Sequence, residues 1–194
     1  MKEIVLGVDG MTLEDLVAIA RKSARIRLAD ESEERITKSR DLVERWLQEG
    51  RVIYGVTTGF GALSDVMIPV EDTRLLQKNI LMSHAVGVGE VLIEEAVRAM
   101  MALRVKDLAR GHAGIRLGTV HRLVEMLNRG IVPIVPEKGS VGASGDLAPL
   151  AHMSLVLIGL GEAFTKGSGC PAQRRSEDAA CNRSDWKQRR DSPW

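Results

Sequence analysis

The sequence predicts a mainly α-helical protein with short strands and one glycine-rich loop. Three observations support this prediction: apolar residues recur at helical spacing, capping residues and glycines bound those stretches, and prolines confine extended structure to short segments. The 194 residues, of which 44% are hydrophobic, are enough to form one domain with its own core.

The first helix is expected to begin after Thr12, a good N-cap residue, with Asp15 three residues later. A second amphipathic helix is expected at about residues 32–48, closed by Gly50. The glycine-punctuated segment after it is interpreted as a loop that follows a short strand at residues 52–53. The apolar stripe expected for the first helix consists of Leu13, Leu16, Val17, Ala20, Ala24 and Leu28.

Three more helices are expected at about residues 72–85, 90–110 and 117–128. Residues 132–136, Val-Pro-Ile-Val-Pro, are expected to be extended because each proline disfavours helix at the residue before it. The methionines of the longest helix are interpreted as core residues rather than ligands. Its apolar positions are Ile93, Val97, Met101, Val105 and Leu108, and those of the helix after it are Val120, Leu123, Val124 and Leu127.

The glycine-rich loop, residues 139–145, reads Gly-Ser-Val-Gly-Ala-Ser-Gly, and Asp146 then opens an apolar run at residues 147–160. Glycine tolerates tight backbone geometry and alanine and serine add little bulk, so the Gly145 nitrogen can approach the Ala143 carbonyl at low steric cost. The alternative is an ordinary Gly/Ser turn that leads into a helix capped by Asp146. From the residues alone, such a turn is the more common case.

The loop and the Asp-Leu-Ala-Pro-Leu-Ala-His-Met-Ser that follows it resemble the signature segment of the aromatic amino acid ammonia-lyases, most of all of the members that act on histidine. In that family an Ala-Ser-Gly tripeptide cyclises autocatalytically and loses two waters, which gives the electrophile 4-methylidene-imidazol-5-one (MIO). The matching residues are Ala143, Ser144 and Gly145. The resemblance therefore implies a self-made MIO group and no metal.

Two further segments support the resemblance. Residues 54–61, Tyr-Gly-Val-Thr-Thr-Gly-Phe-Gly, are similar to the family's tyrosine motif, which implies that Tyr54, the only tyrosine, acts in proton transfer. Ser83-His84 matches the pair that accompanies histidine as substrate, which implies that His84 binds the substrate imidazole. From spacing alone, the first segment is a loop and the histidine is a capping or packed residue at a helix end.

The resemblance covers residues 3–163 and implies the N-terminal portion of the family's helical fold. It also implies conversion of L-histidine to urocanate and ammonia, in histidine degradation, by a homotetramer whose active sites are built from several subunits. The second half of such a lyase is not in this chain, so we expect this truncated form to be inactive. Two alternatives stay open: a noncatalytic helical fragment that only associates with other subunits, and a nonfunctional gene remnant.

The composition changes sharply at residue 164, after which both cysteines and two of the three tryptophans occur together with a dense cluster of charges. We interpret residues 1–163 as the lyase region and residues 164–194 as an aberrant, disordered tail. Permitted codons for residues 180–194, read from the third base, give Leu-Gln-Pro-Ile-Arg-Leu-Glu-Ala-Lys-Glu-Gly-Leu-Ala-Leu. This string resembles the family's continuation, so we hypothesise a frameshift shortly after Ala163.

Bulk properties argue against several other classes of protein. A formal net charge of +1 gives no basic bias toward nucleic acid, and 3% aromatic residues leave little scope for base stacking. No apolar stretch is long enough for a secretion signal or a membrane span, so a cytoplasmic location is expected. Cys170 and Cys181 match no common metal spacing and indicate no disulfide framework, and His112, His121 and His152 are interpreted as surface or packed residues.

Overall fold

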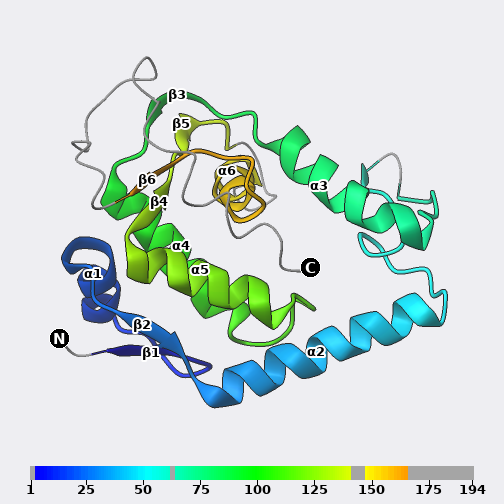
Figure 1. Cartoon of the computed structure of the whole chain (residues 1–194), viewed down its shortest axis with the longest axis horizontal. Helices are drawn as coiled ribbons and strands as arrows, with labels where there is room; N and C mark the ends of the chain where they lie inside the picture. The colour runs from blue at the N-terminus through cyan, green and yellow to red at the C-terminus, as the bar shows by residue number, and fades with distance from the viewer. Residues whose placement is uncertain (1–2, 62–63, 141–146, 166–194) are drawn as a thin grey trace.

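The computed structural model describes residues 3–61, 64–140 and 147–165. These residues are mainly helical, and their strands pair two at a time into small sheets. Figure 1 shows α4 (Glu94–Leu108) and α5 (Leu117–Arg129) side by side in the middle of the molecule. The long helix α2 (Asp30–Gln48) runs along one edge, and α3 (Thr73–His84) leads the chain back along the opposite edge toward α6 (Leu147–Leu157).

The chain begins with a small β-α-β unit. Strand β1 (Ile4–Leu6) pairs in parallel with β2 (Ile26–Leu28), and α1 (Leu13–Lys22) connects them. The Thr12 hydroxyl accepts a hydrogen bond from the Asp15 N–H, and the Asp15 carboxylate accepts one from the Thr12 N–H. This reciprocal capping confirms the predicted start of the helix.

The predicted apolar stripe of that helix is partly wrong. Leu16 and Ala24 pack against the core as predicted, although Ala24 lies beyond the end of the helix. Helix α1 ends at Lys22 because Ser23 adopts the left-handed conformation, with φ of 52°, and turns the chain into β2. Leu28 is therefore buried from a strand and not from the helix, while Leu13 and Val17 within the helix are exposed. The fully buried side chain of α1 is Ile19, which the stripe had left out.

Helix α2 confirms the second predicted helix, and Gly50 follows it with φ of 64°. The strand expected at residues 52–53 is wrong, because the chain goes directly into a turn at residues 54–57. Side-chain hydrogen bonds from Thr57 take the place of strand pairing there. A single turn of 3-10 helix, Val70–Asp72, then leads into α3, which confirms the helix predicted at residues 72–85.

The helix predicted at residues 90–110 begins later than expected. Strand β3 (Val88–Val91) pairs antiparallel with β5 (Pro136–Lys138), so these residues form ladder bonds and α4 starts only at Glu94. Ile93 becomes the N-cap residue and is 63% exposed, not part of the core stripe. The remaining stripe positions are buried as predicted, including Met101.

The predicted helix at 117–128 and the extended segment at 132–136 are confirmed by α5 and by β4 (Ile131–Pro133) with β5. Strand β4 pairs antiparallel with β6 (Ala163–Thr165), which places Phe164 opposite Val132. Ordered structure thus continues two residues into the segment expected to be a tail. Residues 166–194 lie outside the described part of the chain.

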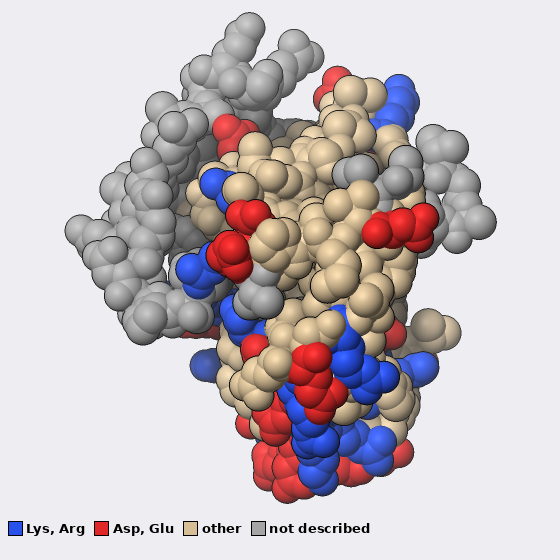
Figure 2. Space-filling view, turned by 90° about the vertical axis from the view of Figure 1, so that its right-hand side faces the viewer, with Lys and Arg blue, Asp and Glu red and all other residues tan. Residues whose placement is uncertain are grey.

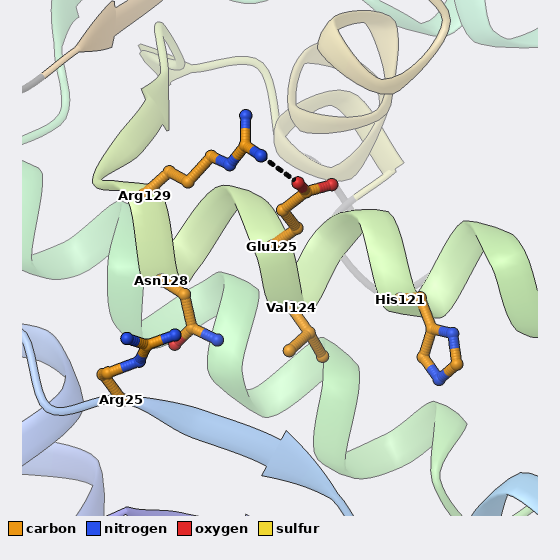
Figure 3. Close-up of a pocket in the computed structure, with 6 residues that line it drawn as sticks. All are labelled: Arg25, His121, Val124, Glu125, Asn128 and Arg129. Carbon is orange, nitrogen blue, oxygen red and sulfur yellow. Dashed lines mark ion pairs between the residues drawn. The ribbon is translucent and has the colours of Figure 1, made fainter.

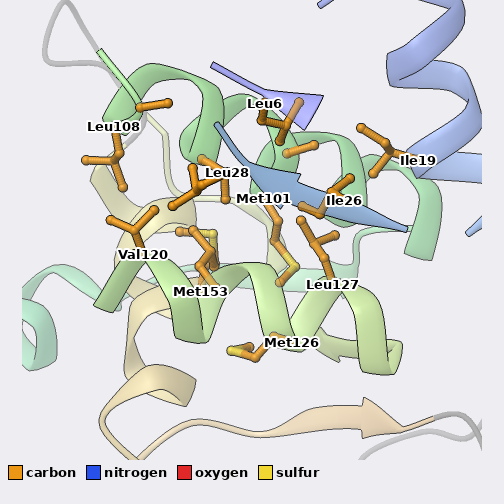
Figure 4. Packing of buried hydrophobic residues seen from close by; sticks show 14 of the residues in the cluster. Leu6, Ile19, Ile26, Leu28, Met101, Leu108, Val120, Met126, Leu127 and Met153 are labelled. Atoms are coloured by element: carbon orange, nitrogen blue, oxygen red, sulfur yellow. The ribbon is translucent and has the colours of Figure 1, made fainter. Parts of the chain in front are cut away.

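The core lies where α1, β1 and β2 meet α4 and α5, with α6 closing it from the other side (Figure 4). Helix α6 ends at Leu157, short of the end of the apolar run at residue 160. Its side chains Ala148, Ala151, Met153 and Val156 are buried. Aliphatic and methionine side chains from all these elements interdigitate in the core, including Leu6, Ile19, Leu28, Met101, Leu123, Met126 and Met153.

One charged side chain, Arg98 of α4, is buried within this core. Its Nε and Nη2 atoms donate to the Ile19 carbonyl of α1 at 3.1 and 2.9 Å, and Nη1 donates to the Leu127 carbonyl of α5 at 3.2 Å. Both carbonyls lie near helix C-termini, where backbone acceptors need outside donors and where the helix dipole favours a cation. Burial lowers the pKa of Arg98, and the nearby Glu94 carboxylate opposes that shift.

Candidate active site

The segment that carries Tyr54 is a turn held together by two buried threonines. The Thr57 hydroxyl accepts from the Ile53 N–H at 2.8 Å and donates to the Arg51 carbonyl at 2.7 Å. The Thr58 hydroxyl accepts from the Gly55 N–H at 3.2 Å. These bonds satisfy backbone groups that have no partner strand, so the turn holds its shape without a sheet.

The Tyr54 side chain is 65% exposed. Its ring makes an edge-to-face contact with Phe60, with centroids 5.5 Å apart. Gly55 has φ of 71°, and a Cβ there would come within 2.9 Å of the Phe60 ring. Glycine is therefore required for the aromatic pair to close over the turn. Gln77 of α3 donates to the Gly55 carbonyl at 3.3 Å and ties the turn to that helix.

His84 is the last residue of α3 and is half-buried. Its Nδ1 lies 2.8 Å from the Ile80 carbonyl oxygen and 3.1 Å from Ser83 Oγ. A carbonyl can only accept, so Nδ1 carries the proton in this arrangement and Nε2 of the neutral ring is left as an acceptor. The ring is thus oriented by its own helix and offers one acceptor to a ligand.

The residues Ala143, Ser144 and Gly145 lie within residues 141–146, outside the described part of the chain, and so does the proposed cap Asp146. The segments on either side are described. Gly139 has φ of 139°, and a Cβ there would come within 2.9 Å of the Gly87 Cα atom. The chain that enters the tripeptide loop therefore packs directly on the chain that leaves His84.

The helix that leaves the loop contacts the same place. The Gly87 N–H donates to Nε2 of His152 on α6 at 3.0 Å. Burial lowers the pKa of His152, which favours the neutral ring that this hydrogen bond needs. The sequence interpretation of His152 as surface or packed did not identify this contact, because no spacing pattern relates two residues 65 positions apart.

The structure does not bring Tyr54 and His84 into contact. Tyr54 contacts Phe60, and His84 bonds to Ser83 and Ile80, with no direct interaction between the two among the described residues. The Tyr54 turn is attached to α3 at Gln77, seven residues before His84, which is about 10 Å along a helix. The two candidate residues therefore share α3 as a common support.

The side of the molecule that carries the Tyr54 segment combines a mostly uncharged upper part with several exposed apolar side chains. Figure 2 shows charged side chains concentrated in the lower part of this side, with a mostly uncharged surface above them. No residue of α3 is buried. The exposed apolar side chains of the Tyr54 segment and α3 are Val52, Tyr54, Phe60, Val66, Met67, Leu75 and Met82. Exposed apolar side chains on neighbouring segments are typical of a surface that further protein covers.

An open hollow lies elsewhere, along α5 and the residue before β2 (Figure 3). Most of its polar side chains already have partners: Glu125 pairs with Arg129 at 2.6 Å, His121 pairs with Glu33 at 2.9 Å, and Asn128 exchanges two hydrogen bonds with the Ile26 backbone. These interactions explain the hollow as part of the scaffold, so it is a weaker candidate site than the Tyr54 and His84 segments.

Within the described residues no helix combines the length and the apolar character that a membrane crossing requires. The same part of the chain contains no cluster of three or more His, Cys, Asp or Glu residues that could hold a metal ion. Both cysteines fall outside it.

Comparison with known proteins agrees with the motifs. The family model described as aromatic amino acid lyase matches residues 11–189. The chain is 54% identical to histidine ammonia-lyase of Caldanaerobacter subterraneus subsp. tengcongensis over 179 residues, 91% of this chain and 35% of that protein. It is also 54% identical to histidine ammonia-lyase of Symbiobacterium thermophilum over 178 residues, 90% of this chain and 35% of that protein. The chain thus spans about a third of the length of these relatives.

Solved structures show the same relationship in three dimensions. Histidine ammonia-lyase from Trypanosoma cruzi superposes with a TM-score of 0.77 at 37% identity, over 85% of this chain and 31% of that one. The ergothioneine-degrading enzyme ergothionase from Treponema denticola superposes with a TM-score of 0.83 at 30% identity, over 92% of this chain and 36% of that one. The chain belongs to the aromatic amino acid lyase family.

Proposed function

We propose that this chain is the N-terminal part of a histidine ammonia-lyase, an enzyme that converts L-histidine to urocanate and ammonia. The observation that carries the proposal is the orientation of His84. Its Nδ1 is bonded to the Ile80 carbonyl, so Nε2 is left to accept the N–H of a substrate imidazole. The 54% identity to relatives named histidine ammonia-lyase supports the same substrate.

The tripeptide Ala143, Ser144 and Gly145 has the chemistry that MIO formation needs. Glycine contributes an unhindered backbone nitrogen, and serine contributes the hydroxyl that leaves as one of the two waters. The close packing of Gly139 on Gly87 and Ala148 supports a compact loop at this place. When formed, MIO supplies an electrophile that no ordinary side chain provides.

The chain's own residues have separate roles in this proposal. His84 binds and orients the imidazole of the substrate. The Tyr54 phenol, which projects from its turn, transfers a proton as the Cβ–H and Cα–N bonds of histidine break and the Cα=Cβ double bond of urocanate forms. Ammonia is the leaving group, and no metal is needed.

The proposed assembly is a cytoplasmic homotetramer. The apolar surface of α3 and the Tyr54 segment supports this, because water-exposed side chains such as Met67, Leu75 and Met82 gain stability when other protein covers them. The alternative function is a noncatalytic fragment that associates with intact subunits through this surface.

We further propose that the segment after β6 arose by a frameshift. The support is the change of composition at residue 164 and the family-like peptide in the shifted reading of residues 180–194. The family match to residue 189 counts against a break near residue 163, because it aligns residues beyond that point with the family. The coding DNA tests the proposal: its shifted frame should continue the lyase pattern, and a shifted frame without that pattern contradicts it.

The catalytic proposal is tested by intact-mass measurement of the purified chain together with an assay for urocanate from L-histidine. A mass lower by two waters is the expected result, and urocanate release would show in addition that the truncated chain, which we expect to be inactive, retains activity. Ser144→Ala is the matched control, because it has no hydroxyl to eliminate and should show neither. An unmodified, inactive chain that copurifies with full-length lyase subunits would instead establish the alternative.

A further inference from the structure

We propose that His152 is a positioning residue of this active site, which fixes the segment carrying His84 against the helix that leaves the Ala143-Ser144-Gly145 loop. The inference rests on the proposed function, since it concerns how the imidazole-binding residue is placed. His152 touches neither substrate nor MIO in this role. It acts through the backbone of Gly87.

Three segments converge at Gly87. Strand β3 begins at the next residue, Val88, and pairs with β5, which ends at Lys138 immediately before Gly139. Helix α6 reaches the same point through the hydrogen bond from the Gly87 N–H to His152 Nε2, 3.0 Å long. The residue three positions after His84 therefore meets both the entry and the exit of the tripeptide loop.

The packing at this point leaves no room for a side chain. A Cβ on Gly87 would lie 3.0 Å from His152 Nε2 and 3.2 Å from the Lys138 carbonyl oxygen. A Cβ on Gly139 would lie 2.9 Å from the Gly87 Cα atom and 3.4 Å from Ala148 Cβ. Because Gly87 and Gly139 have no side chains, the two backbone segments and the His152 imidazole can pack this closely, and this close packing fixes the distances between them.

Helix α3 packs on α6, and its residues are half-buried at most, among them Ile80 and Leu81 near its C-terminal end. The hydrogen bond from Gly87 to His152 of the same helix α6 adds a directional restraint to this packing. His84 is oriented by that end of the helix through the Ile80 carbonyl. The hydrogen bond at Gly87, three residues after His84, restrains the direction of the C-terminal end of α3 and thereby the position of the His84 ring.

The charges around the contact leave His152 as a neutral acceptor. The ionic side chains of β5, Glu137 and Lys138, pair with each other at 3.3 Å. His152 forms no ion pair with any residue that the structure describes. Its Nε2 is the acceptor for Gly87, which leaves Nδ1 as the protonated nitrogen of the neutral ring.

Two substitutions distinguish the effect of the His152 hydrogen-bond acceptor from that of the rest of its ring. His152→Leu removes the acceptor, whereas the Oε1 atom of His152→Gln reaches a similar position to Nε2 and can replace it. Gly87→Ala disturbs the same contact from the other side, and it serves where His152→Leu does not fold. The matched controls are His112→Leu, at an exposed histidine, and Gly118→Ala, where a Cβ meets nothing within 4 Å.

The first readout is hydrogen exchange of the 194-residue chain in the peptide containing Gly87, which requires no catalytic activity. His152→Leu and Gly87→Ala should accelerate exchange there by about tenfold, because the amide loses its acceptor, whereas His152→Gln and both controls keep the wild-type rate. Wild-type exchange in both His152→Leu and Gly87→Ala would overturn the positioning contact.

The second readout is the KM for L-histidine, or the calorimetric dissociation constant if the chain does not turn over. His152→Leu should raise it by about tenfold with kcat changed by less than about twofold, and His152→Gln should restore it. Faster Gly87 exchange with unchanged affinity would overturn the positioning role while leaving the proposed function intact. A wild-type chain that neither binds nor converts histidine would establish the noncatalytic alternative, and it would overturn the role assigned to His152 in substrate binding.

Discussion

The backbone N–H of Gly87 donates a hydrogen bond to Nε2 of His152 at 3.0 Å, which joins the end of the His84 segment to helix α6. A backbone amide can only donate, so the imidazole must present an unprotonated Nε2. Protonation of the ring would break this bond and place a cation at a half-buried position. The contact therefore makes the free energy of unfolding decrease as the pH falls and the ring becomes protonated.

The first prediction concerns that dependence. Burial lowers the pKa of His152 below its ordinary value of 6.5, so the unfolded chain takes up a proton at a higher pH than the folded chain does. The contribution of His152 to folding is complete above pH 6.5 and is lost progressively as the pH falls below it, through the depressed pKa. Urea unfolding at about pH 8 and about pH 5 should therefore show a larger loss of unfolding free energy in wild type than in His152→Gln, which does not titrate. Equal losses in the two proteins would contradict the assignment.

The second prediction concerns Arg98, whose guanidinium binds the Ile19 and Leu127 carbonyls. Arg98→Met keeps much of the side-chain volume but removes both sets of donors from buried acceptors, and it should cost about 3 kcal/mol of unfolding free energy. The loss of unfolding free energy in Arg98→Lys should lie between zero and that of Arg98→Met, because one ammonium group cannot replace all the donors of the planar guanidinium. The control is Arg104→Met on the same helix, whose exposed ion pair with Asp107 contributes less than about 1 kcal/mol. A loss for Arg98→Met no larger than the control's would refute the bridging role.

The helices could be predicted because their signals are local. Capping residues, the spacing of Val97, Met101 and Val105, and the glycine after α2 all act within a few residues along the chain. The errors occurred where a distant segment decides the local structure. Residues 88–91 form a strand because β5 lies beside them, and Leu28 is buried from β2 because β1 pairs with it.

The candidate site shows the same division. Tyr54, His84 and the tripeptide are proposed from motifs, which are contiguous in sequence. Gly87 and His152 were not, because their significance arises from a contact between segments that are far apart along the chain. The tautomer of His84 also depends on a distance, 2.8 Å to the Ile80 carbonyl, that no spacing rule provides.

The third prediction concerns the turn that carries Tyr54. Thr57→Val preserves the shape of a buried side chain but leaves the Ile53 N–H and the Arg51 carbonyl without their hydroxyl partner, which should cost about 2 kcal/mol. Urea unfolding measures this cost. Thr37→Val is the matched control, since that exposed hydroxyl bonds only to a carbonyl of its own helix. Unfolding free energies that drop equally in both variants would show that the turn does not depend on Thr57.

The fourth prediction concerns recognition of the substrate by His84. With Nδ1 donating to the Ile80 carbonyl, Nε2 is the atom that can accept the imidazole N–H of histidine. His84→Leu leaves that N–H unpaired in the complex and should weaken the affinity for L-histidine by about 10-fold to 100-fold. His84→Gln, which has an acceptor but a more flexible side chain, should weaken it less.

The control for this prediction is His121→Leu, because His121 lies on the surface of α5 and pairs with Glu33. The affinity of the His121→Leu variant for L-histidine, measured by calorimetry under the same conditions, should equal that of the wild type. An affinity in His84→Leu that also equals the wild type would remove His84 from the substrate site. The selection of histidine would then have to come from residues beyond those that this structure describes.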